Sequence, residues 1–307
     1  SSIGILNNGD ADAIDLIDDL PFPEREKLYG LNEQEKQMVD VSYICSIRGC
    51  PYRCNYCASP FHWKRDKTRY RSPESVIDEM RLLKNSYWDR YKEFDYSASA
   101  NIGKKSGLII EDNTIVYFVD DVFTVKKERV KRILRMMINE SLGMNWKCEA
   151  RTDHLDDEIC NLMAEAGCVR VKLGFESGSD DILKKIQKDE TKEDMRRGAI
   201  MLRDAGVPFT AYFMAGFPGE TNEDLKQTID FAKEIDADYY SLSILSPYFG
   251  TKMYYNLMEE GFELDKKPWE YFYHQTGELM VNSEISEEVL KEYLALNELN
   301  TDGKGYI

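Results

Sequence analysis

The sequence lacks a long apolar run and lacks any concentration of basic charge. No stretch approaches the roughly 20 apolar residues that cross a bilayer, and no secretory signal is recognisable. The 56 Asp and Glu residues outnumber the 40 Lys and Arg residues, which gives a formal charge of −16. Such a chain repels a polyphosphate. We therefore expect a cytoplasmic protein with no membrane span, for which nucleic acid is a disfavoured partner.

Cysteine is also sparse, and its seven residues are an odd number. An odd count without a signal peptide favours a reducing compartment over a disulfide framework. Cys50, Cys54 and Cys57 have C-x3-C-x2-C spacing directly after the apolar run 41–47. Three thiolates on one short loop can hold three corners of an iron–sulfur cube and leave the fourth iron open, whereas clusters used only for electron transfer are normally closed by four cysteines. An open iron indicates chemistry.

The remaining cysteines allow a different interpretation. Cys45 is a fourth thiol nearby, so a structural zinc site of four cysteines stays open as an alternative. Zinc sites usually pair two well-separated C-x2-C units, which this spacing does not match. We expect Cys45 to be a core thiol on the strand that leads to the loop, and Cys148, Cys160 and Cys168 to be buried small hydrophobic side chains.

From residue 41 onward, β-branched and aromatic runs alternate with amphipathic stretches, as in βα units with a parallel sheet. The predicted strands are 41–47, 114–119, 145–150, 169–175, 209–215 and 239–245. Thr191 with Asp194, and Thr221 with Asp224, match the start of a helix. Six consecutive βα units form an open barrel or a wound sheet, with the chemistry at the carboxyl ends of the strands.

The chain divides into three predicted regions. Residues 1–40 are an acidic, turn-rich linker or arm, and residues 41–247 carry the βα units, with an aromatic and glycine-rich insertion at 86–113. Residues 248–307 are expected to form an α-rich extension that covers the barrel mouth. Within this extension, Tyr273 and His274 are candidate catalytic residues, as substrate contacts or proton donors, because the pKa of histidine lies near neutrality.

The cysteine spacing resembles that of the radical S-adenosylmethionine (radical SAM) enzymes. The resemblance implies an α/β fold with a partial (β/α)6 TIM-like barrel, and a [4Fe–4S] cluster on Cys50, Cys54 and Cys57. It also implies that S-adenosylmethionine (SAM) binds the open iron and is cleaved to a 5′-deoxyadenosyl radical. An electron donor such as flavodoxin or ferredoxin would then be a partner.

The resemblance further implies cofactor contacts at the strand ends, where charged residues recur. Glu176 would accept hydrogen bonds from the ribose or ammonium of SAM, and Arg151 would grip its carboxylate. For Asp121 and Ser177, capping of the following helix is as good an interpretation as contact with SAM. The expected cofactor-binding residues are Tyr52, Tyr56, Val119, Asp120, Asp121, Glu149, Arg151, Glu176, Ser177 and Gly216.

The segment 118–123, Phe-Val-Asp-Asp-Val-Phe, resembles that of the cobalamin-associated subgroup, which includes proteins like the anaerobic magnesium-protoporphyrin cyclase. This implies modification of a small-molecule or peptide substrate in a biosynthetic pathway, by C-methylation, cyclisation or rearrangement. Residues 20–25 resemble the connector that follows a cobalamin domain, but only about 20 residues precede it. We expect cobalamin in a longer parent protein and not in this chain alone. A tRNA or protein methylthiotransferase, and a non-enzymatic zinc or Fe–S module, remain alternatives.

Overall fold

A computed structural model describes residues 14–24, 42–62, 68–92, 116–273, 281 and 284–299. Six strands form one parallel sheet in the order β1-β4-β5-β6-β7-β8. These strands are β1 (Ser42–Ile44), β4 (Val116–Phe118), β5 (Trp146–Ala150), β6 (Cys168–Glu176), β7 (Phe209–Ala215) and β8 (Tyr239–Ile244). Because the spatial order follows the chain order, the sheet has the arrangement of an open barrel. The α/β class and the predicted βα alternation are confirmed.

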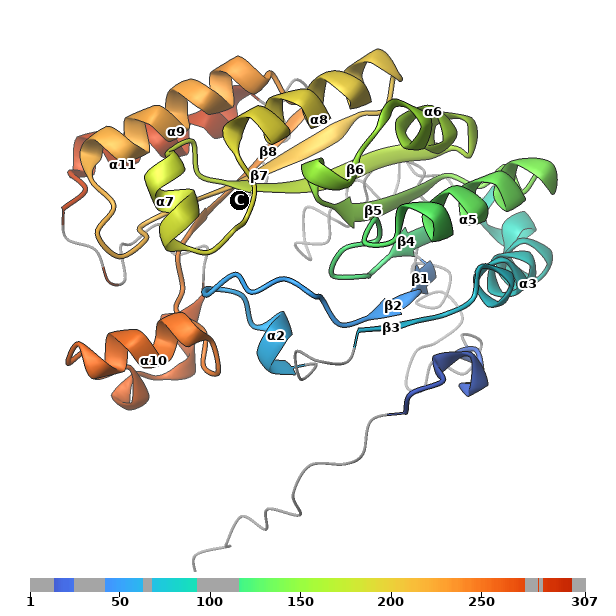
Figure 1. Cartoon of the computed structure of the whole chain (residues 1–307), viewed down its shortest axis with the longest axis horizontal. Coiled ribbons are helices and arrows are strands. Elements are labelled where there is room, and N and C mark those ends of the chain that lie inside the picture. Colours follow the sequence, from blue (N-terminus) through green and yellow to red (C-terminus); the bar gives the residue numbers. More distant parts are fainter. Residues whose placement is uncertain are drawn as a thin grey trace, which may run out of the picture.

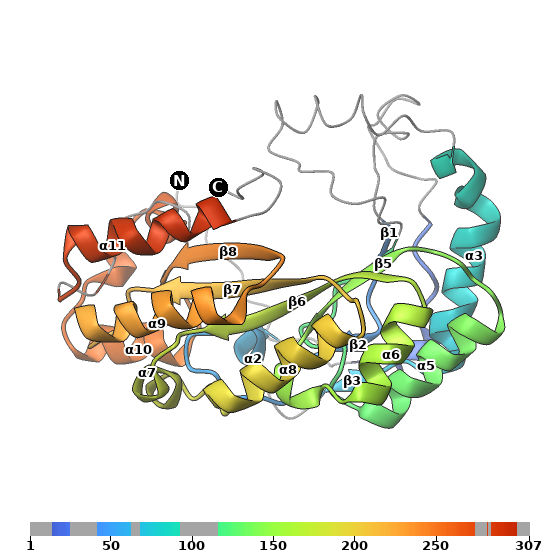
Figure 2. The ribbon, with the colours of Figure 1, turned by 90° about the horizontal axis from the view of Figure 1, so that it is seen from above.

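Helices follow the strands and cover one face of the sheet. They are α3 (Pro73–Lys92), α5 (Lys127–Asn139), α6 (Asp157–Glu165), α7 (Asp180–Lys185), α8 (Lys192–Asp204) and α9 (Asn222–Ile235). Figure 2 shows α5, α6, α8 and α9 side by side along this face. Both predicted helix starts, at Thr191 and at Thr221, are capping boxes in the structure.

Alternation along the strands separates an apolar face from a polar face. Phe118, Cys148 and Leu173 are fully buried toward the helices, as expected for one face of a covered sheet. Their neighbours Tyr117 and Lys172 belong to the opposite face, where they interact with each other. The sheet therefore has a packed outer side and a polar inner side.

The predicted strand 41–47 is wrong in its second half. The parallel strand β1 ends at Ile44, and the short strand β2 (Ile47–Arg48) pairs antiparallel with β3 (Arg69–Tyr70) in a separate sheet. The chain leaves the main sheet because the backbone N–H groups of Ser46 and Ile47 donate to the Asp120 carboxylate. Cys45 consequently lies outside β1 and is partly exposed, so it is not a core thiol.

The other sequence expectations for the cysteines hold. Cys148, Cys160 and Cys168 are buried, and all seven cysteines are free thiols.

No helix in the described part of the chain is long and apolar enough to cross a membrane.

The C-terminal region is mainly helical. It contains α10 (Lys252–Glu259), the 3-10 turns Leu264–Lys266, Trp269–Phe272 and Ala295–Leu299, and α11 (Glu287–Leu294). Figure 1 shows α11 alongside α9, and the Tyr293 hydroxyl donates to the Ser243 carbonyl at the end of β8. Helix α10 begins beside the cysteine loop instead, where the Met253 N–H donates to the Asn55 carbonyl. The domain boundaries stay predictions; most of the insertion 86–113 lies outside the described residues.

Candidate active site

Residues 49–58, here called the cysteine loop, are held at the carboxyl end of β1 by a buried carboxylate. Asp120 follows β4, is 1% exposed, and accepts hydrogen bonds from the Ser46 N–H at 2.6 Å, the Ser46 hydroxyl at 2.5 Å and the Ile47 N–H at 2.8 Å. Both of its oxygens are thus engaged. Burial raises the pKa of Asp120 to about 6, and these hydrogen bonds oppose the rise. The structure places Asp120 as the anchor of the segment that precedes the loop.

The three predicted thiols share this loop. Burial raises the pKa of Cys50 to about 11 and that of Cys57 to about 12, and the neighbouring Cys54 contributes to both shifts. The loop turns through a hydrogen bond from the Cys57 N–H to the Cys54 carbonyl at 3.2 Å. Asp121, which accepts from the Ser59 hydroxyl at 2.6 Å, also raises the pKa of both Cys50 and Cys57. The thiols and Asp121 therefore belong to one electrostatic neighbourhood.

Glu176, at the end of β6, is the predicted residue most closely tied to this neighbourhood. It takes a positive φ of 66° at a register shift of the sheet, a conformation that costs energy for a residue with a side chain. Burial raises the pKa of its carboxyl group, while Lys188 and the hydroxyl of Tyr56 lower it. The ring of Tyr56 meets Phe217 edge-on at 5.8 Å. Tyr56 thus connects the cysteine loop to Glu176.

A buried lysine that the sequence analysis did not identify completes this group. Lys188 is 5% exposed, and its Nζ lies 3.7 Å from Glu176 Oε1 and 3.2 Å from Glu190 Oε2. Its ammonium lowers the pKa of the Cys54 thiol. Gln187 and Asp189, on either side of it, both take positive φ, which makes this turn unusual for residues with side chains. A cation is therefore held between two carboxylates, next to the cysteine loop.

Gly174 makes room for this arrangement. A Cβ at this position would overlap Glu176 Oε1 and would lie 3.1 Å from Lys188 Nζ. The absent side chain allows both charged groups to lie over the strand backbone.

Arg151, at the end of β5, has a different environment from the one expected. Its five N–H donors face the Asp153 carboxylate at 2.9 and 3.0 Å, the carbonyls of Lys188 and Asp189 at 2.9 and 3.2 Å, and Glu190 at 3.5 Å. The guanidinium also lies 3.7 Å from the centroid of the Tyr52 ring. Four hydrogen bonds and an ion pair with Glu190, whose Oε2 accepts no hydrogen bond among the described residues, therefore occupy most of the five donors of this guanidinium. The structure places Arg151 as a brace between the cysteine loop and the 188–190 turn.

Other predicted residues occupy supporting positions. The Tyr52 hydroxyl is hydrogen-bonded to His154. Ser177 is fully buried and interacts with Thr228 of α9 at 3.1 Å, which ties the end of β6 to that helix. The Gly216 N–H donates at 2.6 Å to Glu220, and Gly216 takes a φ of 91°, which suits glycine.

The remaining predicted residues lie farther from this network or outside it. Val119 is 40% exposed at the end of β4. Tyr273 is 55% exposed and interacts electrostatically with Tyr248 in the C-terminal region. His274 lies outside the described residues. The catalytic roles of Tyr273 and His274 stay predictions.

Glu149 belongs to the polar inner face of the sheet. It accepts a hydrogen bond from the Tyr117 hydroxyl, and its Oε1 lies 3.9 Å from Lys172 Nζ. Lys172 donates to the same hydroxyl at 3.3 Å and lies 5.9 Å from the ring centroid of Tyr212. These residues, from β4, β5, β6 and β7, form a polar cluster on the inner side of the sheet, which we call the inner-face cluster.

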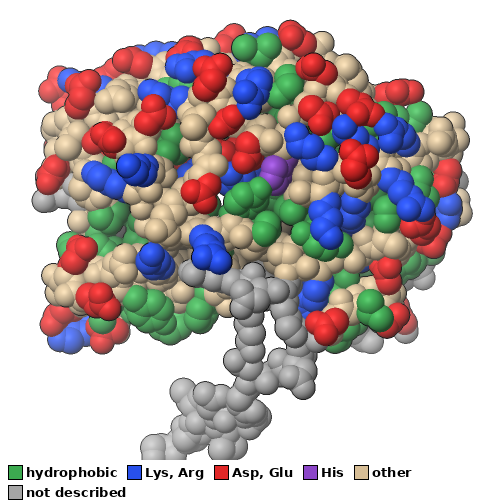
Figure 3. All heavy atoms as spheres, in the orientation of Figure 1, with side chains coloured by type: hydrophobic (Ala, Val, Ile, Leu, Met, Phe, Trp, Pro, Cys, Tyr) green, Lys and Arg blue, Asp and Glu red, His purple; other side chains and the backbone are tan. Residues whose placement is uncertain are grey.

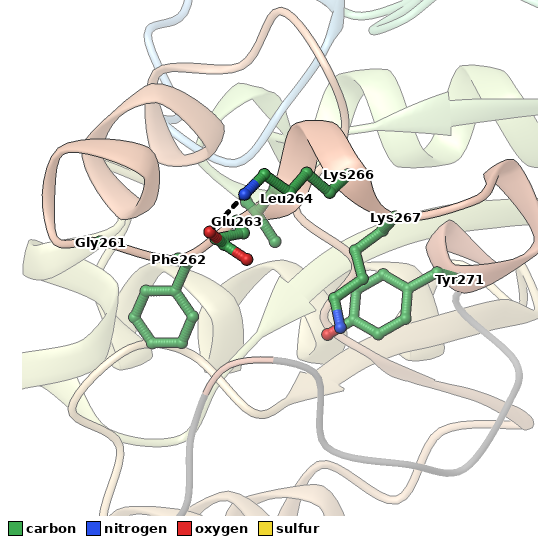
Figure 4. Close-up of a pocket in the computed structure, with 7 residues that line it drawn as sticks. All are labelled: Gly261, Phe262, Glu263, Leu264, Lys266, Lys267 and Tyr271. Atoms are coloured by element: carbon green, nitrogen blue, oxygen red, sulfur yellow. Dashed lines mark hydrogen bonds and ion pairs between the residues drawn. The ribbon is translucent and has the colours of Figure 1, made fainter.

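A separate hollow of about 430 Å³ lies in the C-terminal region. It is lined by Gly261, Phe262, Glu263, Leu264, Lys266, Lys267 and Tyr271. Figure 4 shows Glu263 paired with Lys266, while Lys267 lies over the Tyr271 ring. Its side chains are drawn from a short stretch of surface, and none of them belongs to the network around Glu176.

Comparison with known protein families identifies the family to which this site belongs. The family model described as "Radical SAM superfamily" matches residues 44–232, from the end of β1 through most of α9. This chain belongs to the radical SAM superfamily. The match includes the cysteine loop, Glu176 and Lys188.

Individual relatives agree with this assignment. An uncharacterized methyltransferase of Pyrococcus horikoshii is 29% identical over 238 residues, which are 78% of this chain and 46% of the relative. The anaerobic magnesium-protoporphyrin IX monomethyl ester cyclase of Rubrivivax gelatinosus is 25% identical over 225 residues, 71% of this chain and 36% of the relative. The chain therefore spans less than half the length of both curated relatives.

A solved structure shares the fold. The radical SAM methyltransferase TsrM from Kitasatospora setae, with a tryptophan substrate and a SAM analogue bound, has a TM-score of 0.60 at 21% identity; the match covers 75% of this chain and 41% of that one. The expected partial barrel is consistent with this likeness, and the predicted resemblance to proteins like the anaerobic magnesium-protoporphyrin cyclase is confirmed.

The residues present fit the cluster that this family implies. Three thiols share one loop, Cys54 raises the pKa of both Cys50 and Cys57, and the loop faces a buried cation and a carboxylate rather than a fourth cysteine. Among the described residues, no three His, Cys, Asp or Glu side chains are grouped to hold a metal ion. The fit therefore rests on the chemistry of the thiols and on their surroundings. Within a cluster each thiolate binds a different iron, so one shared ion position is not required.

Proposed function

We propose that this chain binds one [4Fe–4S] cluster through Cys50, Cys54 and Cys57, and that SAM lies between the cluster and the end of β6. The observation that supports the proposal is the position of Glu176 and Lys188 beside the cysteine loop: Tyr56 hydrogen-bonds to Glu176, and the Lys188 ammonium lowers the pKa of Cys54. When bound, the cluster and SAM supply one-electron cleavage of SAM to a 5′-deoxyadenosyl radical. The reaction outcome is modification of a small molecule or peptide, by C-methylation, cyclisation or rearrangement.

The protein residues divide this work in a defined way. Glu176 offers a carboxylate to the ammonium or ribose hydroxyls of SAM, and Lys188 offers a cation to its carboxylate, because charge-assisted hydrogen bonds are the strong ones. Arg151 and Asp120 hold the loop and the turn that carry these groups. Tyr56, packed on Phe217, excludes water from one side. Arg151 is thus given a positioning role in place of the ligand role expected from sequence.

The substrate is proposed to lie against the inner-face cluster of Tyr117, Glu149, Lys172 and Tyr212. This surface offers hydroxyl, carboxylate and ammonium groups within one small area. Such an arrangement suits a substrate with several polar groups. Electron supply by flavodoxin or ferredoxin, a cytoplasmic location and cobalamin use by a longer protein remain predictions.

Anaerobic reconstitution followed by iron analysis and SAM cleavage tests the proposal. The wild-type chain should take up roughly four irons per cluster and release 5′-deoxyadenosine under a strong reductant. Cys50→Ala should lose both properties. Lys172→Met should keep substrate-free SAM cleavage, whereas Glu176→Gln should lower it, because only the latter residue is assigned to SAM. Full iron content and cleavage in Cys50→Ala would refute the cluster assignment.

A further inference from the structure

We infer that His154 is a positioning residue of the cluster site, which raises the reduction potential of the cluster by holding Tyr52 and, through it, a hydrogen bond to the Cys50 sulfur. His154 ends the 3-10 turn Thr152–His154, which follows β5. It lies outside the cysteine loop, and none of the roles proposed above uses its side chain. The inference rests on the proposed function, since it concerns the cluster of the same site.

The imidazole of His154 is enclosed and joins two hydroxyl groups. The residue is 8% exposed. Its Nε2 is hydrogen-bonded to the Tyr52 hydroxyl, and its Nδ1 lies 3.2 Å from the hydroxyl oxygen of Thr124, which is fully buried. Burial lowers the pKa of the imidazole, so the ring is neutral near pH 7. A neutral imidazole has one N–H donor and one acceptor nitrogen, so it serves both hydroxyls at once.

Two side chains from this turn hold the ring of Tyr52. The Arg151 guanidinium lies 3.7 Å from the centroid of the Tyr52 ring, and the centroid of the His154 ring lies 5.5 Å from it. The His154 N–H also donates to the Arg151 carbonyl at 3.2 Å, which fixes the two residues relative to each other. The end of β5 therefore clamps a tyrosine that belongs to the cysteine loop.

The backbone of Tyr52 carries this restraint to a thiol. Burial raises the pKa of Cys50 to about 11, and the largest opposing effect is a hydrogen bond from the Tyr52 N–H to the Cys50 sulfur. A similar bond from the Ser59 N–H opposes the rise at Cys57. Hydrogen bonds to the sulfurs are among the factors that set the potential of an iron–sulfur cluster. A donor favours the more negative, reduced state, so a fixed Tyr52 N–H should raise the potential.

The clamp depends on His154 for its only directional contact with the tyrosine side chain. In the described part of the chain, His154 is the one hydrogen-bond partner of the Tyr52 hydroxyl. A leucine at position 154 would leave the phenol without that partner. The ring could then turn under the guanidinium, and the backbone N–H would move relative to the sulfur.

Net charge is held constant in this comparison. Figure 3 shows Lys and Arg side chains mixed with Asp and Glu side chains over the surface of the molecule. Replacement of a neutral imidazole by another neutral side chain leaves all these charges in place. Since net charge also sets the potential of a cluster, this constancy assigns a shift in potential to the hydrogen bonds.

The test is the reduction potential of the reconstituted cluster in His154→Leu, from a redox titration followed by electron paramagnetic resonance. The ratio of reduced to oxidised cluster at a fixed potential should fall about three- to tenfold, the effect of one hydrogen bond, which is a downward shift of about 28 to 59 mV for one electron. Tyr52→Phe should give the same fall, because it removes the hydroxyl. His154→Gln should stay within about twofold of the wild type, since its amide can replace Nε2 as the partner.

A double-mutant cycle and a matched tyrosine show whether the effect runs through Tyr52. In the Tyr52→Phe protein, the further change His154→Leu should leave the potential unchanged, because changes that remove one shared interaction do not add. Tyr240→Phe is the control: its buried hydroxyl accepts from the Ala237 N–H at 2.9 Å and donates to the Ala232 carbonyl at 3.1 Å. It should lower the stability to denaturant and leave the potential unchanged.

The outcomes are decisive for the inference and for the proposed function separately. An unchanged potential in His154→Leu, or an equal shift in Tyr240→Phe, would make His154 a purely structural residue and overturn the inference. If His154→Leu does not take up the cluster, the comparison of Tyr52→Phe with the wild type gives the same decision. If the wild-type protein itself takes up no cluster, the proposed function fails.

Discussion

Replacing Gly174 with alanine should weaken SAM binding with little effect on the fold. The added Cβ would overlap Glu176 Oε1 and come within 3.1 Å of Lys188 Nζ. Ordinary contact needs about 3.5 Å, so the carboxylate must move by about 1 Å. The clashing atom is the end of a flexible side chain, so the backbone of β6 need not shift. Glu176 would leave the position from which it is proposed to hold SAM.

The magnitudes of the two effects differ. Loss of a charge-assisted hydrogen bond costs about 1.5 to 3 kcal/mol, which raises the Kd for SAM about 10- to 150-fold. Stability should change by less than about 1 kcal/mol, because an alanine in place of glycine also restricts the unfolded chain. The variant should therefore separate binding from folding.

Equilibrium SAM binding to anaerobically reconstituted protein, together with denaturant unfolding, measures both quantities. Gly206→Ala is the control: Gly206 has a φ of 71° and no atom within 4 Å of an added Cβ, so its alanine costs stability by backbone strain alone. This control should unfold more easily and bind SAM normally. Normal SAM affinity in Gly174→Ala would show that the Glu176 carboxylate does not hold SAM.

Three further changes test other parts of the site. Burial raises the pKa of Glu220 to about 7, above its unfolded value of about 4.3. Between these pH values the folded state binds more protons, so the stability of the protein should fall by up to about 4 kcal/mol as pH rises. Unfolding titrations of Glu220→Gln should show a flatter profile. Arg151→Lys should lower the free energy of unfolding by about 3 kcal/mol, because buried carboxylates lose hydrogen-bond partners. The protein that remains folded should keep its affinity for SAM. A tenfold loss of SAM affinity at unchanged stability would instead support Arg151 as a direct SAM ligand. Cys45→Ala should leave iron content unchanged, and a loss of iron would support the four-cysteine alternative.

The sheet could be predicted from the sequence because apolar and polar residues that belong to its two faces alternate along the strands. Strand β7 matches the predicted range 209–215, β5 and β8 differ from prediction by one residue at one end, and β6 is one residue longer at each end. The split of 41–47 could not be predicted, because it depends on Asp120, some 75 residues away in the chain. A run of residues with high β propensity predicts a strand even where its backbone N–H groups donate to a carboxylate that is distant in the sequence.

The candidate site divides in the same way. The cysteine spacing and the strand-end position of Glu176 are local signals. Lys188 gives no such signal, since a charged residue in the turn before a helix start is usually solvated. Only the tertiary fold shows that its ammonium is enclosed by Glu176 and Glu190. The ligand role of Arg151 stays a prediction, because the sequence cannot show that four hydrogen bonds within the protein already engage its guanidinium.

The charges around Lys188 also bear on which ligand the site accepts. Asp153, Glu176 and Glu190 supply three negative charges, and Arg151 and Lys188 supply two positive charges, which leaves one negative charge in a group of which all members except the 26%-exposed Asp153 are buried or nearly so. SAM carries a sulfonium, an ammonium and a carboxylate, a net charge of +1. Burying uncompensated charge is costly, so a ligand of this net charge is favoured over a neutral or anionic one. Arg151 and Lys188 are both needed to hold the three carboxylates together. Removal of either cation should therefore displace the carboxylates that pair with it and those that pair with the other cation.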